Sequence, residues 1–191
     1  MSFNPYDKQP DKAHMDRIEH HIRSTGSIAM GAFLAVGALA WYLLPLWLTM
    51  PGTFEERLRF SIQWSLPILL CLLTAVAMVS TGRRRSAQDV AGSAAGAPSA
   101  TIAIRVAFLQ NTLEQTLLAL GAFLVFSSIM EGSWLSLIPM SAAFFVLGRI
   151  LFFRGYKHGA EGRALGMSLT MLPTTLLYVV ALGGWLLSLF R

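Results

Sequence analysis

Charged residues are scarce in this 191-residue chain. Asp, Glu, Lys and Arg make up 13% of the residues and hydrophobic types make up 54%. A soluble domain carries roughly 25% charged residues. The few charges gather in short clusters that long apolar runs separate. This pattern excludes a soluble protein with a large core and predicts a polytopic membrane protein.

Cysteine is almost absent, since Cys71 is the single one in the sequence. One cysteine excludes an intramolecular disulfide, and no Cys/His spacing resembles a zinc site. We interpret Cys71 as a small buried hydrophobe. We expect no metal site at His14, His20 and His21 either, and interpret residues 1–26 as a solvated, partly helical tail near lipid headgroups.

Acidic residues are also few, and the net charge is +5. In a soluble protein such an excess would suggest nucleic acid as a partner. Here the tendency of membrane proteins to keep positive loops in the cytoplasm explains it, so we expect no nucleic-acid partner.

Five apolar runs are long enough for helices that cross about 30 Å of hydrocarbon. They cover residues 27–49, 60–81, 104–130, 134–153 and 164–190. Backbone groups in lipid must satisfy one another, so each run should be helical. We therefore predict an all-α integral membrane protein with five transmembrane helices per chain. The first run is too long for a cleavable signal peptide, and no A-x-A site follows it.

Prolines occur in four of the runs, where we expect kinked helices. They are Pro45, Pro67, Pro139 and Pro173. The segment 82–101 between the second and third runs is rich in small residues, and we expect a flexible loop there.

The distribution of Lys and Arg predicts the orientation. The tail, the second loop and the fourth loop with its helix edges carry 4 + 4 + 4 = 12 of the 15, which leaves three for the other side. The twelve are Lys8, Lys12, Arg17, Arg23, Arg83, Arg84, Arg85, Arg105, Arg149, Arg154, Lys157 and Arg163. This bias predicts a cytoplasmic N-terminus and an outside C-terminus, and we expect a bacterial inner membrane.

An ionisable residue inside a membrane span costs free energy, so we expect each one to be paired or to face a cavity. Asn111 and Glu114 are three residues apart and share a helix face. Arg149 lies inside the fourth run, and we expect it to meet Glu114 within the bundle. Such a pair is either a purely structural salt bridge or part of a polar cavity open to the cytoplasm.

Arg163 lies at the start of the fifth run, where free backbone N–H groups already favour anions. An arginine there suits a carboxylate or a thiolate, and an adjacent cation lowers the pKa of a thiol. The simpler alternative is an ordinary cytoplasmic anchor.

The order of these residues resembles one family. Asn111-Thr-Leu-Glu114 is followed by Arg149-Ile-Leu-Phe152-Phe-Arg-Gly155-Tyr156 and then by Arg163, so that Arg149, Tyr156 and Arg163 are seven apart and again seven apart. Over about residues 60–190 the chain is similar to the MAPEG family, the membrane-associated proteins of eicosanoid and glutathione metabolism.

The resemblance implies a four-helix subunit, residues 60–191, in a homotrimer, with residues 27–59 as an extra N-terminal helix and loop. It implies glutathione, or a related anionic thiol, between subunits. Asn111, Glu114, Arg149 and Tyr156 match the family's glutathione contacts. Arg163 matches the arginine that stabilises the thiolate, so Arg163 and Tyr156 are the catalytic candidates. A lipophilic second substrate would enter from the lipid bilayer.

The sequence departs from the family pattern at three positions. Ala107 stands where many members carry Arg, Gln115 follows Glu114 where some have Tyr, and Phe152 replaces a Tyr of the third-helix motif. Arg105 lies about 200° around the helix from Ala107 and cannot substitute. The expected pocket is therefore poorer in hydrogen-bond donors.

Two other functions remain open at this point. One is a non-catalytic membrane protein of the same fold that binds lipid or a protein partner. The other, which we rank lower, is a small transporter or channel, because the charges gather at one edge and no inverted repeat is visible. Gly162 and Gly166 have the G-x-x-x-G spacing that permits close helix packing.

Overall fold

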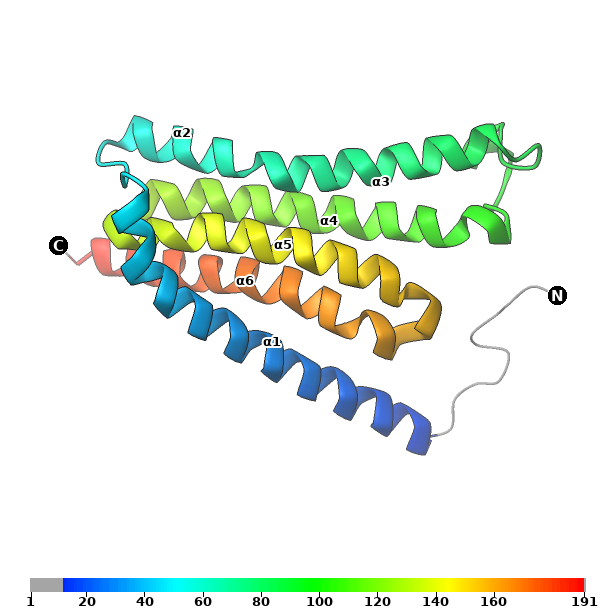
Figure 1. Cartoon of the computed structure of the whole chain (residues 1–191), viewed down its shortest axis with the longest axis horizontal. Coiled ribbons are helices and arrows are strands. Elements are labelled where there is room, and N and C mark those ends of the chain that lie inside the picture. Colours follow the sequence, from blue (N-terminus) through cyan, green and yellow to red (C-terminus); the bar gives the residue numbers. More distant parts are fainter. Residues whose placement is uncertain (1–11, 191) are drawn as a thin grey trace.

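The computed structural model describes residues 12–190, and this part of the chain is helical and contains no strand (Figure 1). The α-helices are α1 (Lys12–Trp47), α2 (Phe54–Trp64), α3 (Leu66–Arg84), α4 (Ala100–Ile129), α5 (Leu137–Gly155) and α6 (Gly159–Ser188). Short 3₁₀ turns η1 (Gly92–Ala95), η2 (Gly132–Ser136) and η3 (Tyr156–His158) lie between them. Lys8 and Arg191, which entered the charge count, lie outside the described residues.

Four stretches of the described chain are long and apolar enough to cross a membrane. They are Lys12–Trp47, Phe54–Arg84, Ala100–Ile129 and Gly132–Ser188. The structure thus confirms an all-helical, multi-pass membrane protein, while the predicted number of five spans is not confirmed by this count. The fourth stretch has 57 residues, which would form a straight helix of about 85 Å. Instead it contains α5 and α6, which run side by side in opposite directions (Figure 1).

The four prolines do not have one common effect. Pro67 lies in the first turn of α3, where its missing N–H breaks no helical hydrogen bond, and Pro139 is the third residue of α5. Only Pro45 and Pro173 lie in helix interiors. The expected interruption is present at Pro67, because the second run divides into α2 and α3 just before it, whereas Pro139 fits the start of α5 and interrupts no α-helix.

Helices α3 to α6 form a four-helix bundle, and α1 lies outside it along α6 and α5 (Figure 1). Few side chains of α1 are buried, and Phe33 is the largest of them, with its ring edge-on to Phe144 at 5.3 Å. About two turns further along α1, Trp41 packs edge-on against Trp134 at 4.4 Å between ring centres. Helix α1 is thus attached to the bundle by aromatic contacts at two levels of its C-terminal half.

Helices α5 and α6 approach so closely that their backbones touch at glycines. A methyl group at Gly166 would lie 2.6 Å from the carbonyl oxygen of Gly148, and one at Gly162 would lie 2.6 Å from that of Gly155. The G-x-x-x-G pair of α6 is therefore used within the chain, against α5. This contact fixes the register between Arg149 on α5 and Arg163 on α6.

Many of the basic residues collect at one end of the bundle. We call the basic end the end formed by residues 12–26, 83–99 and 154–163, which Figure 1 places together, opposite the last turn of α6. The α3–α4 connection at this end is organised by Asp89. Its carboxylate accepts hydrogen bonds from the Ser99 amide (2.8 Å), the Ser99 hydroxyl (2.6 Å) and the Ser86 hydroxyl.

The glycine contact gives a prediction for stability. Gly166→Ala should lower the free energy of unfolding by about 1–3 kcal/mol, because the added methyl group has no room between the backbones. Gly183→Ala in the same helix is the control, since nothing lies near that position, and it should be neutral or stabilising by up to about 1 kcal/mol. Unfolding in mixed micelles measures both. Equal effects of the two changes would contradict the backbone contact.

The Asp89 contacts give a prediction for pH dependence. The hydrogen bonds from Ser86 and Ser99 lower the pKa of Asp89 below its usual value. A lowered pKa means that the carboxylate stabilises the α3–α4 connection at all pH values above the pKa of the unfolded chain. That stabilisation is lost as pH falls through the lower, folded-state pKa. Hydrogen exchange of the Ser99 amide should accelerate in Asp89→Asn at neutral pH, whereas Gln88→Asn should exchange like the wild type.

Candidate functional site

Arg149 is the largest fully buried side chain in the described part of the chain, with 2% of its surface exposed. The last turns of α5 place it inside the bundle. Its Nε and one terminal nitrogen donate to the Thr170 hydroxyl on α6 at 3.1 and 2.8 Å, and the other terminal nitrogen donates to Asn111 Oδ1 on α4 at 2.7 Å. The Thr170 hydroxyl in turn donates to the carbonyl oxygen of Gly166. One guanidinium thus joins three helices.

Aromatic rings complete the surroundings of this guanidinium. Its central carbon lies 4.6 Å from the centre of the Phe152 ring and 5.7 Å from that of Phe145. A cation near a ring face is attracted by the ring's quadrupole, and more strongly where water is excluded. Phe152, which cannot hydrogen-bond as the family's Tyr would, therefore acts here as a stacking partner.

A second cation is joined to the first through two rings. Phe152 packs edge-on against Tyr156 at 5.5 Å between ring centres, and the Arg163 guanidinium lies 4.8 Å from the centre of the Tyr156 ring. We call this series, Arg149, Phe152, Tyr156 and Arg163, the cation–aromatic ladder. The seven-residue spacings seen in the sequence therefore bring Arg149, Tyr156 and Arg163 together.

Glu114 does not meet Arg149, which corrects the contact expected from the sequence. Glu114 is exposed and accepts a hydrogen bond from Gln110 on its own helix at 2.8 Å. The reason is the helical angle, because the buried stripe of α4 passes through Thr112, Gln115 and Thr116, and Glu114 points to another side. Asn111 takes the place beside Arg149 that the sequence assigned to the carboxylate.

No sequence motif predicted the role of Thr170, whereas Arg105 behaves as its helical offset from Ala107 predicted. The Thr170 hydroxyl accepts hydrogen bonds from two of the Arg149 nitrogens. The sequence offered only one indication of this role, which is that a hydroxyl residue stands seven positions after Arg163. Arg105 donates to the carbonyl oxygen of Met78 on α3 at 3.4 Å and so does not fill the place at Ala107.

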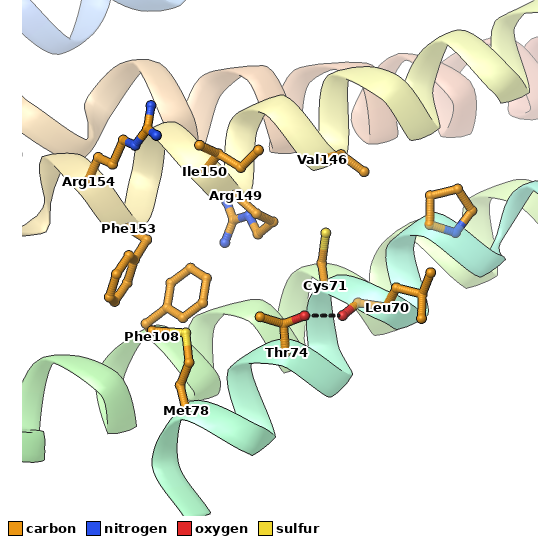
Figure 2. A pocket seen from close by; sticks show the side chains of 11 residues that line it. Leu70, Cys71, Thr74, Met78, Phe108, Val146, Arg149, Ile150, Phe153 and Arg154 are labelled. Carbon is orange, nitrogen blue, oxygen red and sulfur yellow. Dashed lines mark hydrogen bonds between the residues drawn. The ribbon is translucent and has the colours of Figure 1, made fainter. Parts of the chain in front are cut away.

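A groove of about 450 Å³ opens beside Arg149, between α3 and α5 with α4 behind (Figure 2). Its walls are mainly apolar. The lining residues are Pro67, Leu70, Cys71, Thr74, Met78, Phe108, Val146, Arg149, Ile150, Phe153 and Arg154. Cys71 is half-buried, packs against the hydrophobic core and also lines this groove, so it is less buried than the sequence interpretation expected.

A second cavity of about 740 Å³ lies at the basic end. Tyr156 lines it, together with Arg154, Lys157 and His158. Among the predicted site residues, Arg149 and Tyr156 thus line different cavities. Asn111, Glu114 and Arg163 line neither of these two. The predicted residues of one chain do not surround a single closed pocket.

The hydrogen bonds of Arg149 give a prediction. Thr170→Val keeps the shape of the side chain and removes the acceptor of two donors on a buried cation, so the free energy of unfolding should fall by about 2–4 kcal/mol. Thr175→Val is the matched control, because that exposed hydroxyl bonds only to its own helix, and it should change stability by less than about 0.5 kcal/mol. Denaturant unfolding of the two variants in the same micelles checks this, and a neutral Thr170→Val would refute the structural role.

Comparison with known proteins supports the resemblance seen in the motifs. The sequence profile described as "MAPEG family" matches residues 65–183, which is more than half of the chain and contains every predicted site residue. Searches of curated proteins and of solved structures each gave no match. The matched region covers all of α3, α4 and α5 and most of α6, and it begins after α1 and α2. On this match the chain belongs to the MAPEG family.

Proposed function

We propose that this protein binds glutathione, or a related anionic thiol, at the basic end of the bundle. It conjugates the thiol to a lipophilic substrate or uses it to reduce one. The family supplies the class of thiol, and the chain supplies residues suited to it in Asn111, Glu114, Arg149, Tyr156 and Arg163.

One observation carries the proposal. Within residues 12–190 neither Arg149 nor Arg163 forms an ion pair with a carboxylate. A buried or half-buried cation without a counter-charge is costly, and an anionic ligand is the usual remedy. The cation–aromatic ladder holds two such cations on adjoining helices, with the rings of Phe152 and Tyr156 between them.

The complete site requires a neighbouring chain in this proposal. The five residues do not share a cavity in one chain, and Glu114 with Gln110 lies exposed on α4. A homotrimer, as the family implies, supplies the missing wall and gives Glu114 a partner beyond its own helix. Residues 60–191 are then the family's four-helix unit, and 27–59 are an additional helix and loop.

The topology follows from the same arrangement. With α5 and α6 as separate crossings the chain spans the membrane five times. The basic end then faces the cytoplasm, and the last turn of α6 lies outside. The thiol arrives from the cytoplasm, and the lipophilic substrate arrives from the bilayer. The charge pattern fits a bacterial inner membrane.

The proposed chemistry begins at the thiol. Arg163 stabilises the thiolate, so that the thiol proton passes to water and the sulfur becomes the nucleophile. The sulfur then forms a bond to an electrophilic carbon, whose leaving group takes the electron pair of the broken bond. In the peroxide reaction the thiolate attacks the terminal oxygen of the hydroperoxide, the O–O bond breaks, and the leaving alkoxide takes a proton from water to become an alcohol. The resulting sulfenic acid then reacts with a second thiol, which forms the disulfide and releases water. The Tyr156 hydroxyl donates a hydrogen bond to the sulfur or to the leaving oxygen.

The role of Arg163 is testable without knowing the second substrate. In Arg163→Ala the ultraviolet absorbance of bound glutathione thiolate should disappear, because the pKa of the thiol is no longer lowered. Turnover of a reactive lipophilic electrophile should fall by about a hundredfold or more. Arg84→Gln, which removes a cation from the end of α3, is the control and should leave both unchanged. Unchanged thiolate absorbance in Arg163→Ala would contradict the role of Arg163 in stabilising the thiolate.

A second candidate is a non-catalytic membrane protein of the same fold. The hydrogen bonds of Arg149 to Asn111 and Thr170 favour it, because they suit a structural role without any ligand. Titration calorimetry with glutathione distinguishes the two functions. Heat that saturates in the wild type and vanishes in Arg163→Ala supports the enzyme, and no heat in either protein supports the second candidate.

A further inference from the structure

The groove between α3 and α5 is chemically different from the cation–aromatic ladder. From Pro67 to Met78 it follows α3 over about 16 Å, and from Val146 to Arg154 it follows α5 over about 12 Å. Most side chains along this length are apolar, as Figure 2 shows for Leu70, Met78 and Phe153. Its volume of about 450 Å³ is in the range of ligand-sized cavities. Such walls suit a hydrocarbon chain and leave the polar groups of a peptide unsatisfied.

The groove ends in positive charge. Arg154 and Phe153 line both the groove and the second cavity at the basic end, so the two hollows adjoin. Beyond Arg154 the second cavity is lined by Lys157 and His158. Arg154 and Lys157 are exposed, and within the described chain neither is paired with a carboxylate. An apolar channel along a membrane helix thus opens onto unpaired cations at the helix end.

We infer that this hollow binds an anionic phospholipid, with one acyl chain in the groove between α3 and α5 and the phosphate at Arg154 and Lys157. Basic pockets between transmembrane helices bind anionic headgroups, and each cation near the surface contributes about 1 kcal/mol. Arginine suits a phosphate because its planar fork donates two parallel hydrogen bonds. The inference goes beyond the proposed function, since it assigns a lipid site that needs neither the thiol nor Arg163.

Lipid selectivity tests the inference directly. The protein is reconstituted in phosphatidylcholine vesicles, without thiol, and the immobilised fraction of chain-spin-labelled phosphatidylglycerol is compared with that of spin-labelled phosphatidylcholine. The wild type should prefer phosphatidylglycerol by roughly 25-fold, the product of the contributions of two cations. Arg154→Gln with Lys157→Gln should remove that preference, at roughly fivefold in affinity for each cation.

A second pair of variants tests the groove itself. Ile150→Trp should fill the groove and reduce immobilised phosphatidylglycerol to the level of bulk boundary lipid. Leu147→Trp is the matched control, because Leu147 lies on the same helix with similar exposure, 49% against 45%, and does not line the groove. It should retain the wild-type preference. Both positions are partly open, so a larger side chain should leave the helices intact, and circular dichroism checks that the two variants fold.

Three results would overturn the inference. Equal immobilisation of the two lipids by the wild type means that the cations select no headgroup. Retained preference in the double glutamine variant places the headgroup elsewhere. A benzoylphenylalanine at position 150 that cross-links to a second copy of the chain, instead of to phospholipid, means that protein covers the groove. None of these results bears on glutathione binding, which is measured separately.

Discussion

The burial of Arg149 is the constraint on which the rest of the structure depends. A guanidinium inside an apolar bundle must satisfy its donors, and it does so by joining α4 through Asn111 and α6 through Thr170. This requirement explains why hydroxyl and amide side chains lie at one level of otherwise apolar helices. It also explains two glycines. Gly148 and Gly166 let the backbones of α5 and α6 touch, and this close approach keeps Thr170 within reach of Arg149.

The same guanidinium separates two chemical environments. On one side it begins the cation–aromatic ladder, in which two rings lie between Arg149 and Arg163. On its other side it lines the apolar groove between α3 and α5. In our proposals, the thiol approaches this region from the ladder and a lipid acyl chain approaches it from the groove.

Much of the architecture followed from the sequence because lipid leaves the backbone few choices. Apolar run length predicted the membrane helices, and the seven-residue motif spacing, through the family resemblance, predicted one site that includes Arg149, Tyr156 and Arg163. The pairing of Arg149 with Glu114 failed because a three-residue offset turns a side chain by about 60°, which is enough to move it out of a bundle. The role of Thr170 was not predicted because threonines are common in apolar helices, and the sequence does not show which of them faces a buried arginine. The groove at Cys71 depends on the distance between α3 and α5, which no local pattern encodes.

The glycine contact between α5 and α6 also gives the bundle unequal stiffness. Where backbone touches backbone there are no intervening rotamers to rearrange, so α5 and α6 move as one body and the separation of their two arginines is nearly fixed. Between α3 and α5 the groove replaces such contact, and the side chains along it can repack. A change in the width of the groove therefore requires α3 to move, while α5 and α6 keep their positions relative to each other.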